Sequence, residues 1–113
     1  MLQHRPWGTY EVLIDEPTYK VKRIIILPHQ QLSLQYHHHR EEHWTVVNGS
    51  GTIRVGDETK EATVGSRWVI QKEELHRATA KEEHLVFIEV QLGDCVEEDI
   101  IRLEDQYGRI VEQ

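Results

Sequence analysis

The sequence predicts an all-β domain, either a sandwich or a barrel of many short strands. Three observations indicate this class: β-branched and aromatic residues gather in short runs, the runs recur about every 8–12 residues, and glycine-rich turns separate them. Apolar residues with helical spacing do not extend over any long stretch, which argues against a helical bundle. A chain of 113 residues corresponds to one domain with a stable core.

The first part of the chain alternates between strand and turn signals. The segment RPWG at 5–8 is an extended or turn entry, because proline disfavours a helical conformation in the residue before it. β-forming residues predict a strand over 9–14, and the polar segment 15–18 predicts a turn. The strongest strand signal lies at 19–27, where polar and apolar residues alternate before a run of isoleucines, and Pro28 ends it.

The segment 31–39 alternates again with period two, so its odd-numbered residues share one face of a predicted strand. Further strands are expected at 44–47, 52–55, 58–63, 67–70, 76–80 and 84–92, with turns at 48–51, 56–57, 64–66, 71–75 and 81–83. Residues 97–104 are expected to form a helical turn or a short edge strand. These elements make a single domain over 1–113, with a core at about 19–92 and extensions at both ends.

The charge of the chain limits its partners. The formal net charge is −7, whereas a nucleic-acid-binding protein needs a basic face, so nucleic acid is not expected as a partner. The longest apolar run, at 24–27, is far too short to cross a bilayer, and the first ten residues show no signal-peptide pattern. The single cysteine allows no disulfide within the chain. We therefore expect a cytoplasmic protein with no membrane partner.

The most distinctive stretch is QYHHHREEH at 35–43, which holds four of the eight histidines. In a strand, residues i and i+2 lie on one face roughly 6.5–7 Å apart. Gln35, His37 and His39 therefore share a face, and their side chains can converge on one ion, whereas His38 points away.

Two residues outside that face can complete the set. Glu42 follows beyond an expected bend and supplies an oxygen, and His76 joins if the fold brings its turn alongside. A mixed nitrogen and oxygen set of this kind suits one divalent metal ion, which can be Zn²⁺, Mn²⁺, Fe²⁺ or Co²⁺.

The spacing of these residues resembles the two motifs of the cupin family. Residues 35–49 are similar to the first motif, G-x5-H-x-H-x3,4-E-x6-G, with Gln35 in place of the first His. The opening Gly of the motif is missing, because position 29 is His29. Residues 65–80 are similar to the second motif, G-x5-P-x-G-x2-H-x3-N. The interval from the opening Gly to the histidine, His76, matches, whereas the Pro, the second Gly and the Asn of the motif are replaced. The resemblance implies a small jelly-roll barrel with a metal ion inside.

Further segments resemble the type II mannose-6-phosphate isomerases, a cupin group that in bacteria is often fused C-terminal to mannose-1-phosphate guanylyltransferase. The similar blocks cover nearly the whole chain: RPWG at 5–8, YKVKR at 19–23, LSLQYHHHR at 32–40, EHW at 42–44, VQ at 90–91 and EDQYGR at 104–109. The resemblance implies an enzyme of GDP-mannose biosynthesis that interconverts mannose 6-phosphate and fructose 6-phosphate. Guanylyl transfer is not implied, because the chain has no glycine loop that could cradle phosphates. A separate guanylyltransferase is a candidate partner.

The resemblance also implies a set of metal ligands. A Gln/His/Glu/His set is known from the type I isomerases of the wider cupin superfamily, which favours Gln35, His37, Glu42 and His76. His39 stays open as the alternative to Gln35, because both residues share the required face.

Interconversion of an aldose and a ketose moves a proton between C1 and C2 through a cis-enediolate. The reaction needs a base near the carbon and a positive group at the developing oxyanion, which a divalent metal ion can supply. We expect the base to be His39, Glu89 or Lys22.

The substrate phosphate needs arginine or lysine, because the net charge of the chain would otherwise repel it. Arg109, Lys22 and Lys20 are the expected phosphate ligands, and Arg109 also counts among the candidate catalytic residues. Lys20 and Lys22 share one face of their strand, whereas Arg23 takes the other.

Two other functions stay open at this point: a non-catalytic cupin that binds a sugar phosphate or sugar nucleotide, and another metal-cupin chemistry such as an iron-dependent oxygenase. An isomerase of phosphosugars needs a cationic pocket, which an oxygenase with an apolar substrate does not. We also expect a homodimer, because cupins commonly pair through edge strands and such pairing protects those edges from aggregation.

Overall fold

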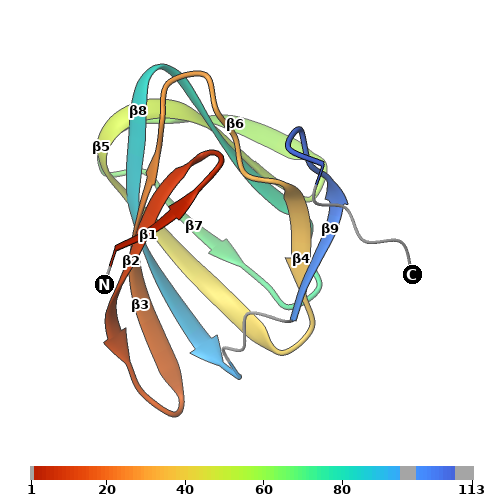
Figure 1. Ribbon diagram of the computed structural model, residues 1–113. Helices are drawn as coiled ribbons and strands as arrows, with labels where there is room; N and C mark the ends of the chain where they lie inside the picture. Colours follow the sequence, from red (N-terminus) through yellow and green to blue (C-terminus); the bar gives the residue numbers. More distant parts are fainter. Residues whose placement is uncertain (1, 95–98, 109–113) are drawn as a thin grey trace.

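The structure, a computed structural model, describes residues 2–94 and 99–108 (Figure 1). Its strands are β1 Leu2–Arg5, β2 Gly8–Asp15, β3 Tyr19–Ile26, β4 Leu34–His37, β5 Arg40–Val55, β6 Glu58–Ala62, β7 Arg67–Ile70, β8 His76–Gly93 and β9 Ile100–Glu104. All of the strand pairs are antiparallel, and no α-helix occurs among the described residues. The predicted all-β class is confirmed. In the part of the chain that the structure covers, no helix is long and apolar enough to cross a membrane.

Two long strands, β5 and β8, run through both layers of the barrel. In one layer the first part of β5 pairs with the last part of β8. Strands β3, β2 and β1 follow one another outward from β8, and β7 pairs with β5 on the other side. In the other layer the last part of β5 pairs with the first part of β8. Strands β4 and β9 follow one another outward from β8, and β6 pairs with β5. Strands β4 and β9 therefore lie on one side of the barrel and β1 to β3 on the other (Figure 1).

The sequence-based prediction of turns at 48–51 and 81–83 is wrong. Both segments lie inside the long strands, at the corner where β5 and β8 pass from one layer to the other. The pairing changes register there, because Gly49 pairs with Leu85 whereas Gly51 pairs with Ala80.

The glycines at this corner serve a close contact between two backbones. A Cβ atom at Gly49 would lie 1.7 Å from the carbonyl oxygen of His84, and one at Gly51 would lie 2.1 Å from that of Thr79. Only glycine leaves room for the crossing. A glycine-rich segment that the sequence pattern assigns to a hairpin is thus a bend between two sheets.

Other predicted elements are confirmed with small changes. The hairpin at 56–57 joins β5 to β6, and Gly56 has a φ of +59° there. The strand expected at 31–39 is shorter, since β4 covers Leu34–His37 and the next two residues form a bend. Of the two forms expected for 97–104, the described part is a strand, β9, which pairs with β4.

The side chains that face the barrel interior change from apolar to polar along each central strand. Val46 and Trp44 of β5 are followed by Glu42 and Arg40, and all four are buried. Neighbouring strands show the same change in register: Phe87, Glu89 and Gln91 of β8, and Ile24, Lys22 and Lys20 of β3. One end of the interior is therefore an apolar core, in which the Trp44 and Phe87 rings stack 4.4 Å apart. The other end is polar.

Candidate metal centre

A cavity opens into the polar end of the barrel. Its lining combines acidic, basic and amide side chains with a histidine, drawn from β1, β3, β4, β5, β8 and β9. The charged and polar members include Arg5, Lys22, Gln35, Arg40, Glu42, His76, Glu89, Gln91 and Arg102. Such a mixture suits a charged ligand that also needs oriented hydrogen bonds.

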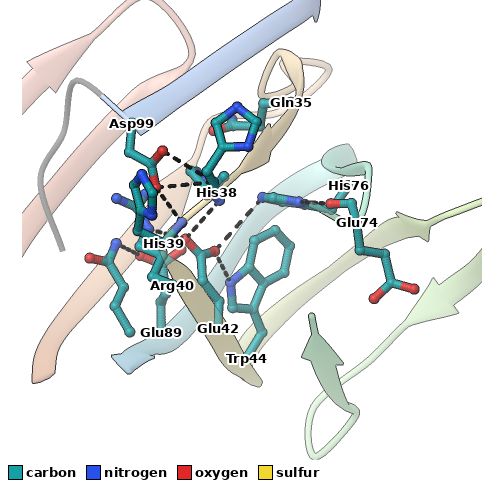
Figure 2. Close-up of polar contacts among 12 residues, drawn as sticks. Gln35, His38, His39, Arg40, Glu42, Trp44, Glu74, His76, Glu89 and Asp99 are labelled. Atoms are coloured by element: carbon teal, nitrogen blue, oxygen red, sulfur yellow. Dashed lines mark hydrogen bonds and ion pairs between the residues drawn. The ribbon is translucent and has the colours of Figure 1, made fainter. Parts of the chain in front are cut away.

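Three buried side chains from different strands meet at this end: His37 of β4, Glu42 of β5 and His76 of β8. Each offers a ligand atom, and these atoms lie within 4.8 Å of one another. His37 Nδ1 is 3.5 Å from Glu42 Oε2. His76 Nε2 is 3.8 Å from Glu42 Oε1 (Figure 2). A histidine and carboxylate set of this kind matches the ligands of zinc and related divalent ions.

The state of both histidines fits metal binding. His76 Nδ1 donates a hydrogen bond to the Glu74 carbonyl oxygen at 2.9 Å, which leaves the lone pair of Nε2 directed towards Glu42. His37 Nε2 is buried and has no hydrogen-bond partner. Burial lowers the pKa of His76 to about 4, and burial together with the Arg40 charge lowers that of His37 to about 2. Both imidazoles are therefore neutral at pH 7, which is the form that ligates a metal.

Glu42 is held in place by its neighbours along β5. Arg40 Nε donates to Oε2 at 2.9 Å, and Trp44 Nε1 donates to Oε1 at 3.0 Å (Figure 2). Sequence reasoning did not assign Arg40 or Trp44 to the site. The signal was present, because both residues lie two positions from Glu42 and therefore share its face.

The two alternatives for a fourth ligand differ in position. Gln35 lines the cavity and pairs in register with His76. Its Nε2 donates to Ser33 Oγ at 3.2 Å, so its carbonyl oxygen is the atom suited to a metal.

His39 is exposed and does not line the cavity. The bend after β4 explains this, because the Asp99 carboxylate accepts hydrogen bonds from the backbone N–H groups of His38 and His39 (Figure 2). The bend interrupts the alternation of side chains along the strand, so His39 does not share the face of Gln35 and His37, contrary to the prediction.

Of the three expected bases, Glu89 and Lys22 line the cavity and His39 does not. Glu89 is buried, and burial together with the Glu42 charge raises its pKa to about 8. Its Oε2 accepts a hydrogen bond of 2.6 Å from Gln91 Nε2, whereas Gln91 Oε1 is buried without a hydrogen-bond partner. Sequence reasoning missed Gln91, although it lies two positions from Glu89.

The expected phosphate ligands differ in whether they line the cavity. Lys22 is 5% exposed and lines the cavity, whereas Lys20 is partly buried and is not among the lining residues. Arg109 lies outside the described residues. Arg102 of β9 lines the cavity and pairs in register with Gln35, which no local sequence pattern could have revealed.

Comparison with known protein families gives a match over nearly the whole chain. Residues 1–105 match the family described as mannose-6-phosphate isomerase C-terminal. The alginate biosynthesis protein AlgA of Pseudomonas aeruginosa is 42% identical over 96% of the chain. The xanthan biosynthesis protein XanB of Xanthomonas campestris pv. campestris is 43% identical over 94%, and the mannose-1-phosphate guanylyltransferase ManC of Salmonella typhimurium is 38% identical over 95%. The chain spans 23% of the length of each of these relatives.

Solved structures share the fold at low sequence identity. A double-stranded β-helix protein from Klebsiella pneumoniae is 19% identical, with a TM-score of 0.72 over 83% of this chain and 82% of that chain. A cupin-2 domain protein from Rhodospirillum rubrum is 20% identical, with a TM-score of 0.69 over 80% of this chain and 67% of that chain. These likenesses confirm the expected cupin barrel.

Proposed function

Because the chain belongs to the mannose-6-phosphate isomerase C-terminal family, whose fold is a cupin barrel, we propose that it is a metal-dependent isomerase. The reaction is the interconversion of mannose 6-phosphate and fructose 6-phosphate through a cis-enediolate. The observation that carries the proposal is the buried group of His37, Glu42 and His76 beside a cavity lined with basic side chains.

The proposed metal ligands are His37, Glu42 and His76, with Gln35 as the fourth. The orphaned His37 Nε2 and the oriented His76 ring support a single divalent ion, which can be Zn²⁺, Mn²⁺, Fe²⁺ or Co²⁺. When bound, such an ion polarises a sugar oxygen and stabilises the negative charge that develops there.

We assign the proton transfer to Glu89. In the direction from aldose to ketose, its carboxylate takes the proton from C2 and returns it to C1, while a hydroxyl proton moves from O2 to O1. A buried carboxyl group with a pKa raised to about 8 holds a transferred proton well, and its ionised form, which accepts the C2 proton, becomes more populated as the pH rises towards 8. The hydrogen bond from Gln91 holds one carboxylate oxygen and so orients the group.

The basic residues of the cavity support an anionic substrate. The net charge of −7 would repel a phosphate, whereas Lys22, Arg40 and Arg102 provide positive charge inside the barrel. This lining favours a phosphosugar over the apolar substrate of an oxygenase. Arg109 stays a proposed phosphate ligand, although it lies outside the described residues.

The proposal is tested by removing the metal, restoring Zn²⁺, Mn²⁺, Fe²⁺ or Co²⁺ one at a time, and measuring formation of fructose 6-phosphate from mannose 6-phosphate. We expect turnover with at least one ion, and loss of both metal and turnover in His37→Ala. The matched control is His38→Ala, an exposed neighbour that should keep both. Binding without turnover under every metal would instead favour a non-catalytic sugar-phosphate module, and a His37→Ala variant that keeps metal and activity would refute the ligand assignment.

The length of the relatives supports a further partner. The chain corresponds to 23% of each relative compared above, one of which is a guanylyltransferase. We therefore propose that a separate guanylyltransferase acts beside this protein in the cytoplasm. Co-purification of the two proteins from cells that express both would test the association.

A further inference from the structure

Three side chains from the first three strands gather on one side of the cavity: Arg5 of β1, Tyr10 of β2 and Lys22 of β3. The Arg5 guanidinium carbon is 5.0 Å from the centre of the Tyr10 ring, and Lys22 Nζ is 4.6 Å from the same centre. Arg5 Nη2 also donates a hydrogen bond to the Tyr10 hydroxyl at 3.0 Å. One aromatic ring therefore holds two cations against the cavity.

The two cations are close enough to repel each other. Because both lie beside one ring, they are at most about 10 Å apart, which is the distance over which 0.1 M salt screens charges. Lys22 is 5% exposed, so water screens its charge weakly. An anion bound beside both cations would be attracted by the two charges together. Arg5 retains donors for such an anion, since its bonds to Tyr10 and to the His4 carbonyl use two of its five N–H groups.

We propose that Arg5, Tyr10 and Lys22 form an anion subsite that takes the phosphate of the sugar substrate. The inference deepens the proposed function and rests on it for the identity of the phosphate ester. It assigns Lys22 to phosphate binding and leaves the proton transfer to Glu89. It also adds Arg5 and Tyr10, which lie before the main histidine cluster in the sequence.

The spacing between this subsite and the metal centre agrees with the assignment. Lys22 pairs in register with Glu89, and Glu89 pairs with Trp44, two residues from Glu42 on the same strand face. Strands β3 and β5 thus lie on either side of β8, roughly 10 Å apart, since neighbouring strands are 4.7–4.9 Å apart. Glu89 lies between them. An open-chain sugar phosphate can therefore extend from the metal centre, past the carboxylate of Glu89, to the two cations.

The subsite is tested by measuring the dissociation constant of inorganic phosphate by titration calorimetry on the metal-loaded protein at fixed ionic strength. We expect Arg5→Gln and Lys22→Met each to raise the dissociation constant of phosphate about tenfold. This change corresponds to the loss of one charge-assisted hydrogen bond. Arg5 is exposed, so Arg5→Gln should not disturb the fold. The matched control is Arg23→Gln, because Arg23 lies next to Lys22 but is exposed on the other face and pairs with Glu11.

The same variants separate the subsite from the proposed reaction. If wild-type protein isomerises mannose 6-phosphate, Arg5→Gln should raise its KM about tenfold with little change in kcat. Weakened phosphate binding in Arg5→Gln without any turnover in the wild-type protein would support the subsite and contradict the proposed reaction. Turnover with an unchanged KM in both variants, or phosphate binding that both variants retain in full, would overturn the subsite and leave the reaction standing.

Discussion

Glu42 is the residue on which the polar end of the barrel converges. Its two oxygens accept hydrogen bonds from Arg40 and Trp44, and both oxygens also face histidine rings. A buried carboxyl group without hydrogen-bond partners is costly, so these donors stabilise its position. Arg40 and Trp44 therefore hold the Glu42 carboxyl group with its oxygens aimed at the place where a cation would bind.

Replacing Glu42 by glutamine removes one negative charge at nearly unchanged volume. We expect metal affinity to fall about tenfold or more, because a neutral amide oxygen is a weaker ligand than a carboxylate. We also expect the free energy of unfolding to fall by about 3 kcal/mol, because Arg40 loses its buried counter-charge. Metal content after dialysis and urea denaturation measure the two effects. Glu41→Gln is the control: this neighbour pairs with His43 at the partly exposed surface, so it should change stability by less than about 1 kcal/mol and leave metal binding intact.

The titrating groups of the cavity predict how the stability of the metal-free protein depends on pH. The folded-state pKa values of His37 and His76 are about 2 and 4, against 6.5 when unfolded, so below pH 6.5 the unfolded chain binds protons that the folded protein does not. Glu89 acts in the opposite sense, since its folded-state pKa of about 8 exceeds the unfolded value of 4.5. The folded protein therefore keeps a proton on Glu89 that the unfolded chain releases between pH 4.5 and 8.

The signs combine into a maximum of stability near pH 6.5. From pH 4.5 to 6.5 two histidines outweigh one carboxyl group, so the free energy of unfolding should rise with pH by roughly 1.4 kcal/mol per unit. Above pH 6.5 the contribution of the two histidines fades while that of Glu89 persists to about pH 8, so the free energy of unfolding should fall. Urea denaturation of metal-free protein at pH 5, 6.5 and 8 tests this. Glu89→Gln should abolish the decline above pH 6.5, and a steady rise from pH 5 to 8 in the wild-type protein would contradict the prediction.

At the scale of elements, the fold has two layers because β5 and β8 both pass from one layer to the other at the corner. Each strand pairs with the other on both sides of the corner, so the corner sets how the halves of the barrel meet. The candidate metal centre depends on this arrangement, because Glu42 lies in the first part of β5 and His76 begins β8. Only a β8 that passes through both layers brings His76 beside His37 and Glu42.

Gly51→Ala tests the corner directly. The backbone angle of Gly51 is an ordinary one, but a Cβ atom there would lie 2.1 Å from the Thr79 carbonyl oxygen, so the strands must move apart. We expect the free energy of unfolding to fall by about 3 kcal/mol or more. Gly65→Ala is the comparison, since Gly65 has a φ of +92° and open space around its Cα, and backbone strain alone should cost about 1 kcal/mol. Equal losses in the two variants would contradict the account of the corner.

At the scale of the whole molecule, the chain is acidic overall, whereas the lining of the cavity is basic. The chain has a net charge of −7, yet basic residues outnumber acidic ones in the cavity lining: Arg5, Lys22, Arg40 and Arg102 against Glu42 and Glu89. The net negative charge of the chain repels anions at long range, whereas the local excess of positive charge in the cavity provides a place for one. Placing the charges inside also limits screening by salt.

The expected homodimer belongs to this scale. Within the described residues, β1, β6, β7 and β9 each pair with one strand, so each leaves one edge for another chain. Light scattering should therefore give twice the chain mass of 13.4 kDa. A mass of one chain at every concentration would contradict the prediction. We likewise propose that residues 1–113 fold as a single domain, which a single cooperative unfolding transition would support.

Part of the candidate site was predictable from local spacing. His37 and Glu42 lie five residues apart around a bend, and their interval is visible in the sequence. Arg40 and Gln91 could have been found by extending the same two-residue alternation, since each lies two positions from an assigned residue. Arg102 and Asp99 could not, because their roles depend on β9 pairing with β4 and on a carboxylate that meets the backbone of a bend 60 residues away.

By itself, the sequence determined the all-β class, most strand positions and the face that Gln35 and His37 share, because period-two alternation is a property of neighbouring residues. Only the tertiary structure decided that 48–51 and 81–83 are crossings and that His39 is turned outward. It alone brought His76 beside His37, with ring centres 4.9 Å apart. The physical reason is that these outcomes depend on contacts between distant segments: a carbonyl that leaves no room for a Cβ atom, a carboxylate that holds a bend, and a strand long enough to join two sheets.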